Sequence, residues 1–293
     1  MKKVAILRRR KLGYTSCREI SARSTKGIQV VRNDREVPND VDLVIRWGTT
    51  SNVPIQNVIN TAKAIHAVND KREFRKVLDE HELCPPTYFN YKGPSLGGLI
   101  PAVSGEEYDT YVTPMILRPS KHAQGRNVHV VRNTAEASSF ARKYGEGNYY
   151  VSELINKVAE YRVFVAQGRV ACVAEKTPGN PDDVAWNVAK GGRFDNVRWD
   201  NWPLKAVRKA VEAFNLSGLD FGGVDVMVDD EGEAYVIEIN SAPSLTSPYR
   251  QQCMAKVFDY MIENGKESIP MKQERGGYRK FIHPAITDKA ELV

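Results

Sequence analysis

Two carboxylates and one amide toward the end of the chain have the residue types and spacing of a metal site. Residues 222–243 read GGVDVMVDDEGEAYVIEINSAP, in which two runs of strand character flank a polar turn. This pattern predicts a β-hairpin with strands at 224–229 and 234–240. With a two-residue turn, Asp225 lies directly across from Glu238 on the paired strands.

Two opposed carboxylates on an apolar hairpin repel one another. Their Cβ atoms would be about 4.5–5.5 Å apart, and the pair is destabilising unless a cation sits between them. Oxygen ligands from Asp225, Glu238 and Asn240 suit Mg²⁺, which also takes phosphate oxygens. The alternative is a solvent-facing polar edge with one protonated carboxylate. Strict alternation along strand 234–240 predicts two faces, one with Val236, Glu238 and Asn240, the other with Tyr235, Ile237 and Ile239.

Other side chains that often carry chemistry are scattered along the chain. The 4 cysteines stand singly without a C-x-x-C pair, so we expect free buried thiols rather than a disulfide framework or a zinc site. The 5 histidines are expected to be structural or exposed, with His122 as the best exception. The cysteines are Cys17, Cys84, Cys172 and Cys253.

The first third of the chain must supply a small α/β unit. Apolar runs at 3–7, 27–31 and 41–45 have strand length, and the apolar residues of 55–65 have helical spacing. We therefore expect a compact N-terminal lobe over residues 1–66.

The rest of the chain alternates strand and helix signals around the hairpin. Asn69 or Asp70 caps a helix that stops before the prolines at 85–86, and residues 86–110 have the composition of a connector. Pro203 opens a helix whose end is marked by Gly218. Further expectations are strands at 112–118, 127–131, 148–153, 161–167 and 169–175, helices near 135–144 and 250–263, an irregular stretch at 176–202 and a loosely attached tail at 265–293.

Composition and charge narrow the class of protein. The chain has 293 residues, 42% hydrophobic and 27% charged, which predicts a soluble globular protein with more than one core. It shows neither a membrane span nor a signal peptide, so we expect a cytoplasmic protein. The net charge of +6 is concentrated in residues 1–35, which carry eleven basic and two acidic side chains. That excess is either a solvated surface or an attractor for a polyanion or an acidic substrate.

A series of short motifs completes the chemistry of the hairpin. Taken singly, each has a structural explanation, such as a strand end, an ion pair or a turn. In chain order they are VNDK at 68–71, PPT at 85–87, MILRP at 115–119, QG at 124–125, VSELI at 151–155, EYRVFV at 160–165 and NVAKGG at 187–192.

In combination and order, these motifs resemble the ATP-grasp superfamily, most closely its RimK-like α-L-glutamate ligase branch. The resemblance spans about residues 67–245, and it places Asp225, Glu238 and Asn240 on the family's magnesium ligands. Arg118 stands where the family has a lysine that contacts ATP phosphates. The resemblance further assigns to nucleotide binding Gln124 and Gly125 in the phosphate loop, Glu153, Leu154 and Ile155 beside the adenine, and Glu160 and Lys176.

The same resemblance assigns the catalytic groups. Arg162 and Lys190 would stabilise the γ-phosphate and an acyl-phosphate, and Asn187 would contribute phosphate or metal contacts. The implied cofactors are ATP and Mg²⁺, with Mn²⁺ as an alternative. Such a site works mainly by positioning and electrostatics.

The fold implied is α+β or α/β, an ATP-grasp domain in which two α+β subdomains sandwich the nucleotide behind a small α/β N-terminal lobe. We expect the ATP-grasp domain at 67–264, with a central lid subdomain at about 110–153 and a C-terminal catalytic subdomain at about 154–264. Residues 265–293 form the tail.

The leading hypothesis for function is ATP-dependent ligation of a carboxylate to an amine, in which an amino acid is joined to a peptide, protein or small-molecule acceptor. One alternative is a ligase whose nucleophile is a thiol or hydroxyl. Another is a ligase for a polyanionic or modified nucleic-acid acceptor, or a non-catalytic binder of ATP and nucleic acid, docked through residues 1–35. No nucleic-acid motif accompanies that basic cluster. Dimers and tetramers are common in resembling families, which leaves a homo-oligomer open.

Overall fold

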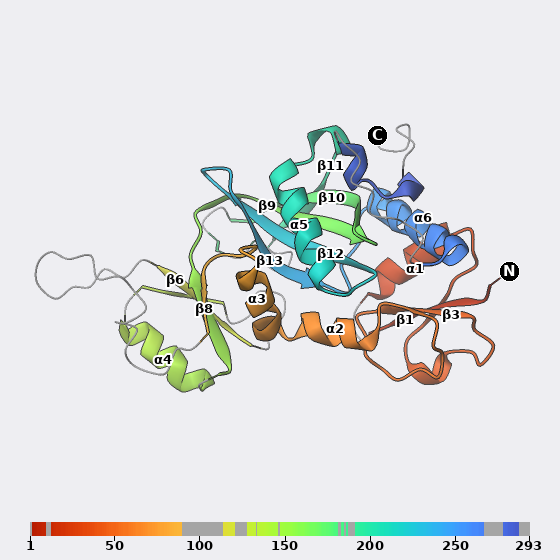
Figure 1. Cartoon of the computed structure of the whole chain (residues 1–293), viewed down its shortest axis with the longest axis horizontal. Coiled ribbons are helices and arrows are strands. Elements are labelled where there is room, and N and C mark those ends of the chain that lie inside the picture. Colours follow the sequence, from red (N-terminus) through yellow and green to blue (C-terminus); the bar gives the residue numbers. More distant parts are fainter. Residues whose placement is uncertain are drawn as a thin grey trace, which may run out of the picture.

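Three β-sheets organise the chain. The computed structural model describes residues 2–9, 13–89, 114–120, 128–132, 134–145, 147–180, 183–184, 186, 191–266 and 278–286. Figure 1 shows a four-stranded N-terminal sheet on the right, a five-stranded central sheet in the middle and a second four-stranded sheet, the small sheet, on the left. The central sheet therefore touches both of the others.

The N-terminal sheet is parallel and has the strand order β2-β1-β3-β4. Its first three strands confirm the strands expected from the apolar runs. Helix α1 was not anticipated, because its buried positions include only two hydrophobic residues, Cys17 and Ile20. The elements are β1 (Val4–Arg8), α1 (Tyr14–Arg23), β2 (Gln29–Val31), η1 (Asp34–Glu36), β3 (Leu43–Trp47) and β4 (Val58–Ile59).

Two short helices lead from this sheet to the others. The helix expected over 55–65 is wrong in its first half, because strand β4 pairs with β3 there and α2 (Ala62–Asn69) begins only after the Thr61 side chain caps it. Helix α3 (Lys71–Glu80) starts at the expected Asp70 cap, whose carboxylate accepts from the Glu73 N–H. A Ser, Thr or Asp cap supplies a partner for an otherwise unpaired N–H of the first turn.

The small sheet is antiparallel, with the strand order β5-β8-β6-β7, and helix α4 packs on it. The last three strands and the helix agree with the expected positions within a few residues, whereas β5 falls at the start of the stretch expected to be a connector. They are β5 (Thr87–Tyr88), β6 (Met115–Pro119), β7 (His129–Val131), α4 (Thr134–Tyr144) and β8 (Tyr149–Glu153).

The central sheet is antiparallel throughout, with the order β11-β10-β9-β12-β13. The expectation of an irregular stretch at 176–202 is wrong in part, because β11 forms there as a largely exposed edge strand without apolar alternation. Pro203 is the residue before α5, not its first helical residue. The elements are β9 (Lys157–Ala166), β10 (Arg169–Thr177), β11 (Arg193–Val197), η4 (Trp199–Asn201), α5 (Leu204–Leu216), β12 (Phe221–Asp229), β13 (Ala234–Asn240) and α6 (Pro248–Asn264).

Part of the C-terminal tail is bound to the central sheet, which corrects the expectation of a loose extension. Residues 278–286 form the short turns η5 (Tyr278–Phe281) and η6 (Pro284–Ile286). Ile286 is 2% exposed, and the backbone N–H of His283 donates to the carbonyl of Val170 on β10 at 2.9 Å. This segment is held by burial and by strand-like pairing.

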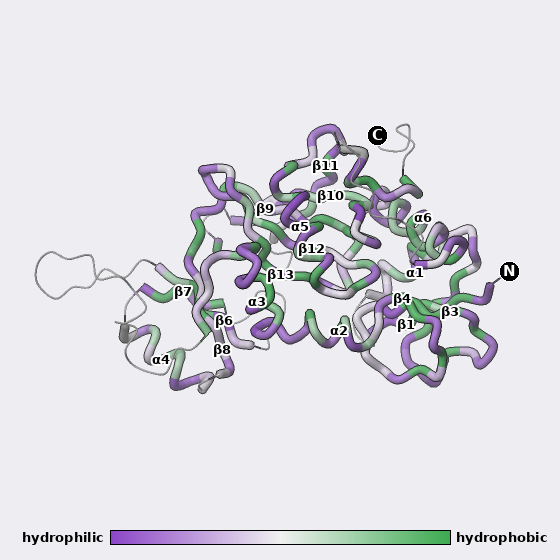
Figure 2. The backbone as a smooth tube through the Cα atoms, in the orientation of Figure 1, coloured by the Kyte–Doolittle hydropathy of each residue, from purple (hydrophilic) through white to green (hydrophobic). Residues whose placement is uncertain are grey.

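The hydrophobic cores do not follow the division into three sheets. One continuous core joins one face of the N-terminal sheet to the central sheet and α6. The other face of the N-terminal sheet and the small sheet each have a separate core of six buried residues. Hydrophobic segments accordingly concentrate along the central and N-terminal strands in Figure 2. Within the described residues, no helix combines the length and apolar character needed to cross a bilayer.

Candidate active site

A cavity of about 760 Å³ opens between the small sheet and the central sheet. The structure brings together here nine of the residues expected from the sequence. They are Arg118, Glu153, Leu154, Ile155, Glu160, Arg162, Lys176, Asp225 and Glu238. Gln124, Gly125, Asn187 and Lys190 lie outside the described residues.

Asp225 lies opposite Glu238 in the hairpin of β12 and β13, as expected. The two-residue turn on which that expectation rested is wrong, because Val228 pairs with Ala234 and not with Tyr235. The predicted alternation along β13 is also wrong, because a bulge falls just after the pair of Asp225 and Glu238 and leaves Ile237 without a partner on β12. Consequently Val236 and Ile239 are both in the core, while Ile237 and Glu238 both line the cavity. A bulge inserts one extra residue and so reverses the face that follows.

Asp225 is neutralised by cations of the protein itself. Arg162, its cross-strand neighbour on β9, donates from Nε and Nη2 to the two Asp225 oxygens at 2.6 and 2.8 Å, and Lys176 Nζ adds a bond of 2.9 Å. Burial alone would raise the pKa of Asp225, but Arg162 and Lys176 outweigh it and hold the pKa below its ordinary value. The repulsion expected between Asp225 and Glu238 is therefore already relieved without a cation between them.

A line of alternating charges continues from Asp225 along the cavity wall. Lys176 also pairs with Glu160, whose other oxygen pairs with Lys157 Nζ at 2.5 Å. All three side chains are at most 11% exposed. Burial lowers the pKa of Lys157, as does repulsion from Lys176 and Arg118, against the opposing effect of Glu160. The sequence comparison missed Lys157, although it lies only two residues after the expected adenine segment.

Apolar side chains share the lining of this cavity with the charged groups. Ile116, Met227 and Ile237 line it together with Leu154 and Ile155 of the segment after β8. Glu153 is oriented there by the Tyr88 hydroxyl, which donates to its Oε1 at 3.3 Å. An apolar slot beside a cationic wall matches a flat base that carries phosphates.

Arg118 is placed to meet an anion. Its side chain lines the cavity at the end of β6, and its Nε is buried without a hydrogen-bond partner in the part of the chain that the structure describes. A buried donor without a partner is costly unless a ligand or water satisfies it.

Helix α3 supplies two further cations that sequence reasoning did not select. Arg75, 2% exposed, donates to the carbonyls of Val236 and Ile237 at 3.3 and 2.6 Å. One turn earlier, Lys71 Nζ lies 3.1 Å from the Ile239 carbonyl and 3.4 Å from Glu238 Oε2. The i, i+4 spacing of Lys71 and Arg75 was the sequence signal that both cations lie on one face of the helix. Together they cover the outer edge of β13, including its bulge.

The donor set of the hairpin fits a hard divalent cation. Asp225 and Glu238 are cross-strand neighbours, and Asn240 Nδ2 donates to Glu238 Oε1 at 3.0 Å, which keeps the amide beside the carboxylates. Carboxylate and amide oxygens are ligands that Mg²⁺ accepts. Since the described residues hold no cluster of three or more His, Cys, Asp or Glu, a metal here would need oxygens from a ligand as well.

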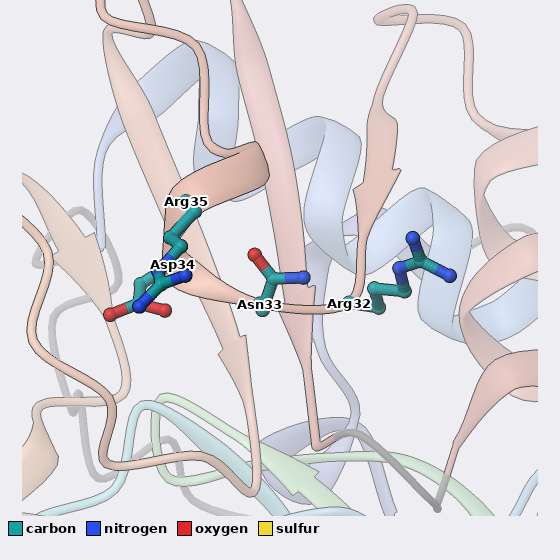
Figure 3. A pocket seen from close by; sticks show the side chains of 4 residues that line it. All are labelled: Arg32, Asn33, Asp34 and Arg35. Atoms are coloured by element: carbon teal, nitrogen blue, oxygen red, sulfur yellow. The ribbon is translucent and has the colours of Figure 1, made fainter.

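A second hollow, of about 370 Å³, lies over the turn between β2 and η1. In Figure 3 the four side chains that line it, Arg32, Asn33, Asp34 and Arg35, spread apart instead of converging. Arg32 pairs with Glu36, and Asn33 caps η1. The four side chains therefore do not point toward a common centre where a ligand could bind.

Much of the basic excess of residues 1–35 is balanced locally. Five of its side chains form ion pairs with acids, Lys3 with Asp40, Arg18 and Arg23 with Glu19, Lys26 with Glu263 and Arg32 with Glu36. The exposed ring of Tyr14 lies between the guanidinium groups of Arg8 and Arg18, at 5.1 and 5.8 Å.

Comparisons with known proteins agree with this geometry. The sequence model of the ATP-grasp domain, R2K clade family 3, matches residues 67–259. A probable alpha-L-glutamate ligase of Aliivibrio salmonicida is 28% identical over 229 residues, covering 75% of this chain and 72% of that protein. A D-alanine--D-alanine ligase of Laribacter hongkongensis is 27% identical over 149 residues, 46% of each chain.

Solved structures show a similar fold at low identity. A D-alanine--D-alanine ligase from Bacillus anthracis has a TM-score of 0.63 at 14% identity, covering 90% of this chain and 97% of that one. A Chryseobacterium gregarium RiPP-associated ATP-grasp ligase, solved with ADP and a leader and core peptide, has a TM-score of 0.60 at 16% identity, covering 88% and 96%. Likeness at these identities shows the fold alone.

Proposed function

Because this chain belongs to the ATP-grasp family, in its R2K clade, we propose that the cavity between the small and central sheets activates a carboxylate with ATP and passes it to an amine. The protein is a ligase with relatives among the RimK-like glutamate ligases. The observation that carries the proposal is the cavity itself, whose lining combines apolar side chains with buried cations beside the Asp225 and Glu238 pair.

The nucleotide would lie along this cavity. Leu154 and Ile155 would flank the adenine with Glu153 nearby, and Arg118 would hold the phosphates together with the loop of Gln124 and Gly125. Lys176, kept charged between Asp225 and Glu160, would contribute to the same phosphates. The unsatisfied Arg118 Nε supports this orientation.

The chemical difficulty is to bring an anionic carboxylate to an anionic γ-phosphate. A carboxylate oxygen would attack the γ-phosphorus and the bond to the β-phosphate oxygen would break, which yields an acyl-phosphate and ADP. The amine would then attack the carbonyl carbon, lose a proton and expel inorganic phosphate. Arg162 and Lys190, with Asn187, would stabilise the charge that develops on the transferred group.

Asp225, Glu238 and Asn240 would hold the divalent cation, Mg²⁺ or Mn²⁺. When bound, such an ion neutralises phosphate charge and fixes the geometry of the transferring group. The family uses ATP with a divalent metal, and solved relatives include one described with Mg and ADP. Which metal this chain uses is part of the proposal.

The substrates are a carboxylate and an amine. Because the curated relatives are named alpha-L-glutamate ligases, we propose L-glutamate or a similar amino acid as one substrate. Solved neighbours bind precursor peptides, which supports a peptide or protein acceptor. We place the reaction in the cytoplasm, and a homo-oligomer stays a prediction.

Phosphate release tests the ligase proposal directly. Full-length protein with ATP, Mg²⁺, amino acids and amine acceptors should release phosphate faster only when both a carboxylate and its acceptor are present. Asp225→Asn with Glu238→Gln should abolish release, whereas Glu263→Gln, on the outer face of α6, should keep it. Undiminished ATP cleavage in the double variant would refute the metal assignment. The absence of stimulation by any acceptor would argue against ligation.

A polyanionic acceptor is the second candidate, and the Arg8–Tyr14–Arg18 cluster is the observation in its favour. Because several basic side chains of residues 1–35 form ion pairs, fewer cations are available to a polyanion than the sequence suggests. Binding to RNA or to a polyglutamate peptide should weaken steeply with salt if this cluster docks phosphates or carboxylates. A Tyr14→Ala, Arg18→Gln variant that binds both probes as well as the parent would exclude this surface.

A further inference from the structure

Both carboxylates of the metal site are held by cations that come from different elements. Asp225 is bound by Arg162 on β9 and Lys176 on β10, whereas Glu238 lies 3.4 Å from Lys71 on α3. Lys71 is 13% exposed and is fixed by a second contact, 3.1 Å to the Ile239 carbonyl. The ammonium of Lys71 therefore stands where a cation bound to Glu238 would have to approach.

The charge balance of this cluster opposes a metal that arrives alone. Among the described residues, four cations, Lys71, Lys157, Arg162 and Lys176, are linked by ion pairs to three carboxylates, Glu160, Asp225 and Glu238. These seven described groups together carry one excess positive charge before any ligand binds. A divalent ion would raise that excess in a mostly buried site, where unpaired charge is costly. Nucleotide phosphates would supply the missing negative charge.

We propose that Lys71 is a resident counter-ion of Glu238, and that a divalent cation binds this site tightly only together with nucleotide. The inference rests on the proposed metal site and states what controls metal binding there. When metal and phosphates enter together, Lys71 and Arg162 exchange their carboxylate partners for phosphate oxygens. Metal and nucleotide affinities are then coupled, and the coupling is reciprocal.

Lys71 can be tested without dismantling the site. Helix α3 keeps its own hold on β13, because Arg75 binds the Val236 and Ile237 carbonyls independently of Lys71. Lys76 on the same helix offers a matched control, since among the described residues it forms an ion pair with Glu73 alone and its side chain is 37% exposed. Lys71 and Lys76 both lie on α3, so the variant and its control alter the same helix.

The experiment measures Mn²⁺ binding to the full chain, with and without ADP, by calorimetry or by electron paramagnetic resonance. The parent should bind Mn²⁺ at least tenfold more tightly with ADP present. Lys71→Gln, which keeps a donor for the Ile239 carbonyl, should bind Mn²⁺ alone about fivefold more tightly than the parent and lose most of the coupling. Lys71→Met should do the same if it folds, whereas Lys71→Arg and Lys76→Gln should stay within twofold of the parent.

Unchanged or weaker binding of Mn²⁺ alone by Lys71→Gln would overturn the proposal, and so would an equal gain in Lys76→Gln. Equal Mn²⁺ affinity of the parent with and without ADP would overturn the coupling. None of these measurements uses an acceptor or turnover. A failure of acceptor-stimulated phosphate release would therefore refute the ligase proposal and leave this one standing.

Discussion

The N-terminal sheet and the small sheet both flank the central sheet, but they are attached to it in different ways. The N-terminal sheet shares one hydrophobic core with the central sheet, whereas the small sheet is stabilised by its own core around Leu117 and Val151. The body formed by the N-terminal and central sheets should therefore unfold as one unit, and the small sheet should be able to move or melt separately.

Buried polar contacts reinforce the first attachment. Asn60, 0% exposed and in a left-handed conformation at φ 63°, exchanges four hydrogen bonds with Asp220 and Phe221 at the start of β12. Gly48 lies so close to the loop after β13 that an added Cβ would be 2.6 Å from the Ala242 Cβ. The Leu245 N–H of the same loop donates to Ser16 on α1 at 3.0 Å. The N-terminal sheet thus helps to position the loop that follows β13.

Among the described residues, the small sheet is linked to the body through α3. Its β8 strand meets Arg75 of α3 through the Tyr150 ring, at 5.6 Å, and the Thr87 N–H of β5 donates to Asp79 Oδ1 of α3 at 3.2 Å. Arg75 also lines the cavity. A motion of the small sheet would displace its cavity-lining residues Ile116 and Arg118 and leave Asp225 and Glu238 in place.

Matched leucine truncations should separate the two cores. Leu43→Ala removes a side chain from the shared core and Leu117→Ala one from the small core, and each should cost about 3 kcal/mol where it acts. Leu43→Ala should lower the single unfolding transition of the body. Leu117→Ala should accelerate amide hydrogen exchange only in β6 and β8. Equal exchange across all three sheets in both variants would contradict the division.

Asn60→Ala should loosen the N-terminal sheet from β12. It removes the side-chain oxygen that accepts from the Asp220 and Phe221 N–H groups and keeps a positive φ on alanine, at a cost of about 3 kcal/mol. Urea denaturation measures the loss. Asn57→Ala, which deletes an exposed bond to the Asp42 carbonyl, is the control and should cost under about 0.5 kcal/mol. A similar loss of unfolding free energy in both variants would show that Asn60 does not hold the N-terminal sheet to β12.

Gly48→Ala should disturb the loop after β13 by steric pressure, costing about 2 kcal/mol and reducing turnover. Ala242→Gly removes the opposing Cβ, and the double variant should recover the steric part of the loss, although alanine at φ 68° keeps some strain. A double-mutant cycle in denaturant gives the interaction. Additive losses would mean that the two segments are not pressed together.

Acid should detach the C-terminal segment before it unfolds the body. Burial, aided by the charge of Arg169, lowers the pKa of His283 from 6.5 to about 3. Because the folded pKa lies below the unfolded one, this stabilisation is complete above pH 6.5 and declines as pH falls toward 3. At pH 5 the loss should be about 2 kcal/mol.

Limited proteolysis of residues 278–286 between pH 7 and pH 5 measures this detachment. His283→Gln should flatten the pH dependence, and His81→Gln, at an exposed site on α3's end, should not. A parent segment equally protected at both pH values would rule out the titration of His283.

Local signals made much of the fold predictable. The hairpin pattern of residues 222–243 predicted the pairing of Asp225 with Glu238, and the Asp70 cap predicted the start of α3. Helix α1 and strand β11 escaped notice because each buries too few apolar residues to show a period. The loose tail was a wrong expectation for a related reason, since its few apolar residues are buried by β10 and α6 and not by one another.

The chain's own sequence determined which groups could do the chemistry, namely Asp225, Glu238 and Asn240 with the cations Arg118, Arg162 and Lys176. Only the tertiary structure decided how they are balanced. The bulge at Ile237 sets which face Glu238 occupies, and α3 brings Lys71 to that carboxylate from more than 160 residues away in sequence. Residue types and short-range periodicity can be read from a local stretch of sequence. Burial and charge neutralisation depend on which distant segments come into contact.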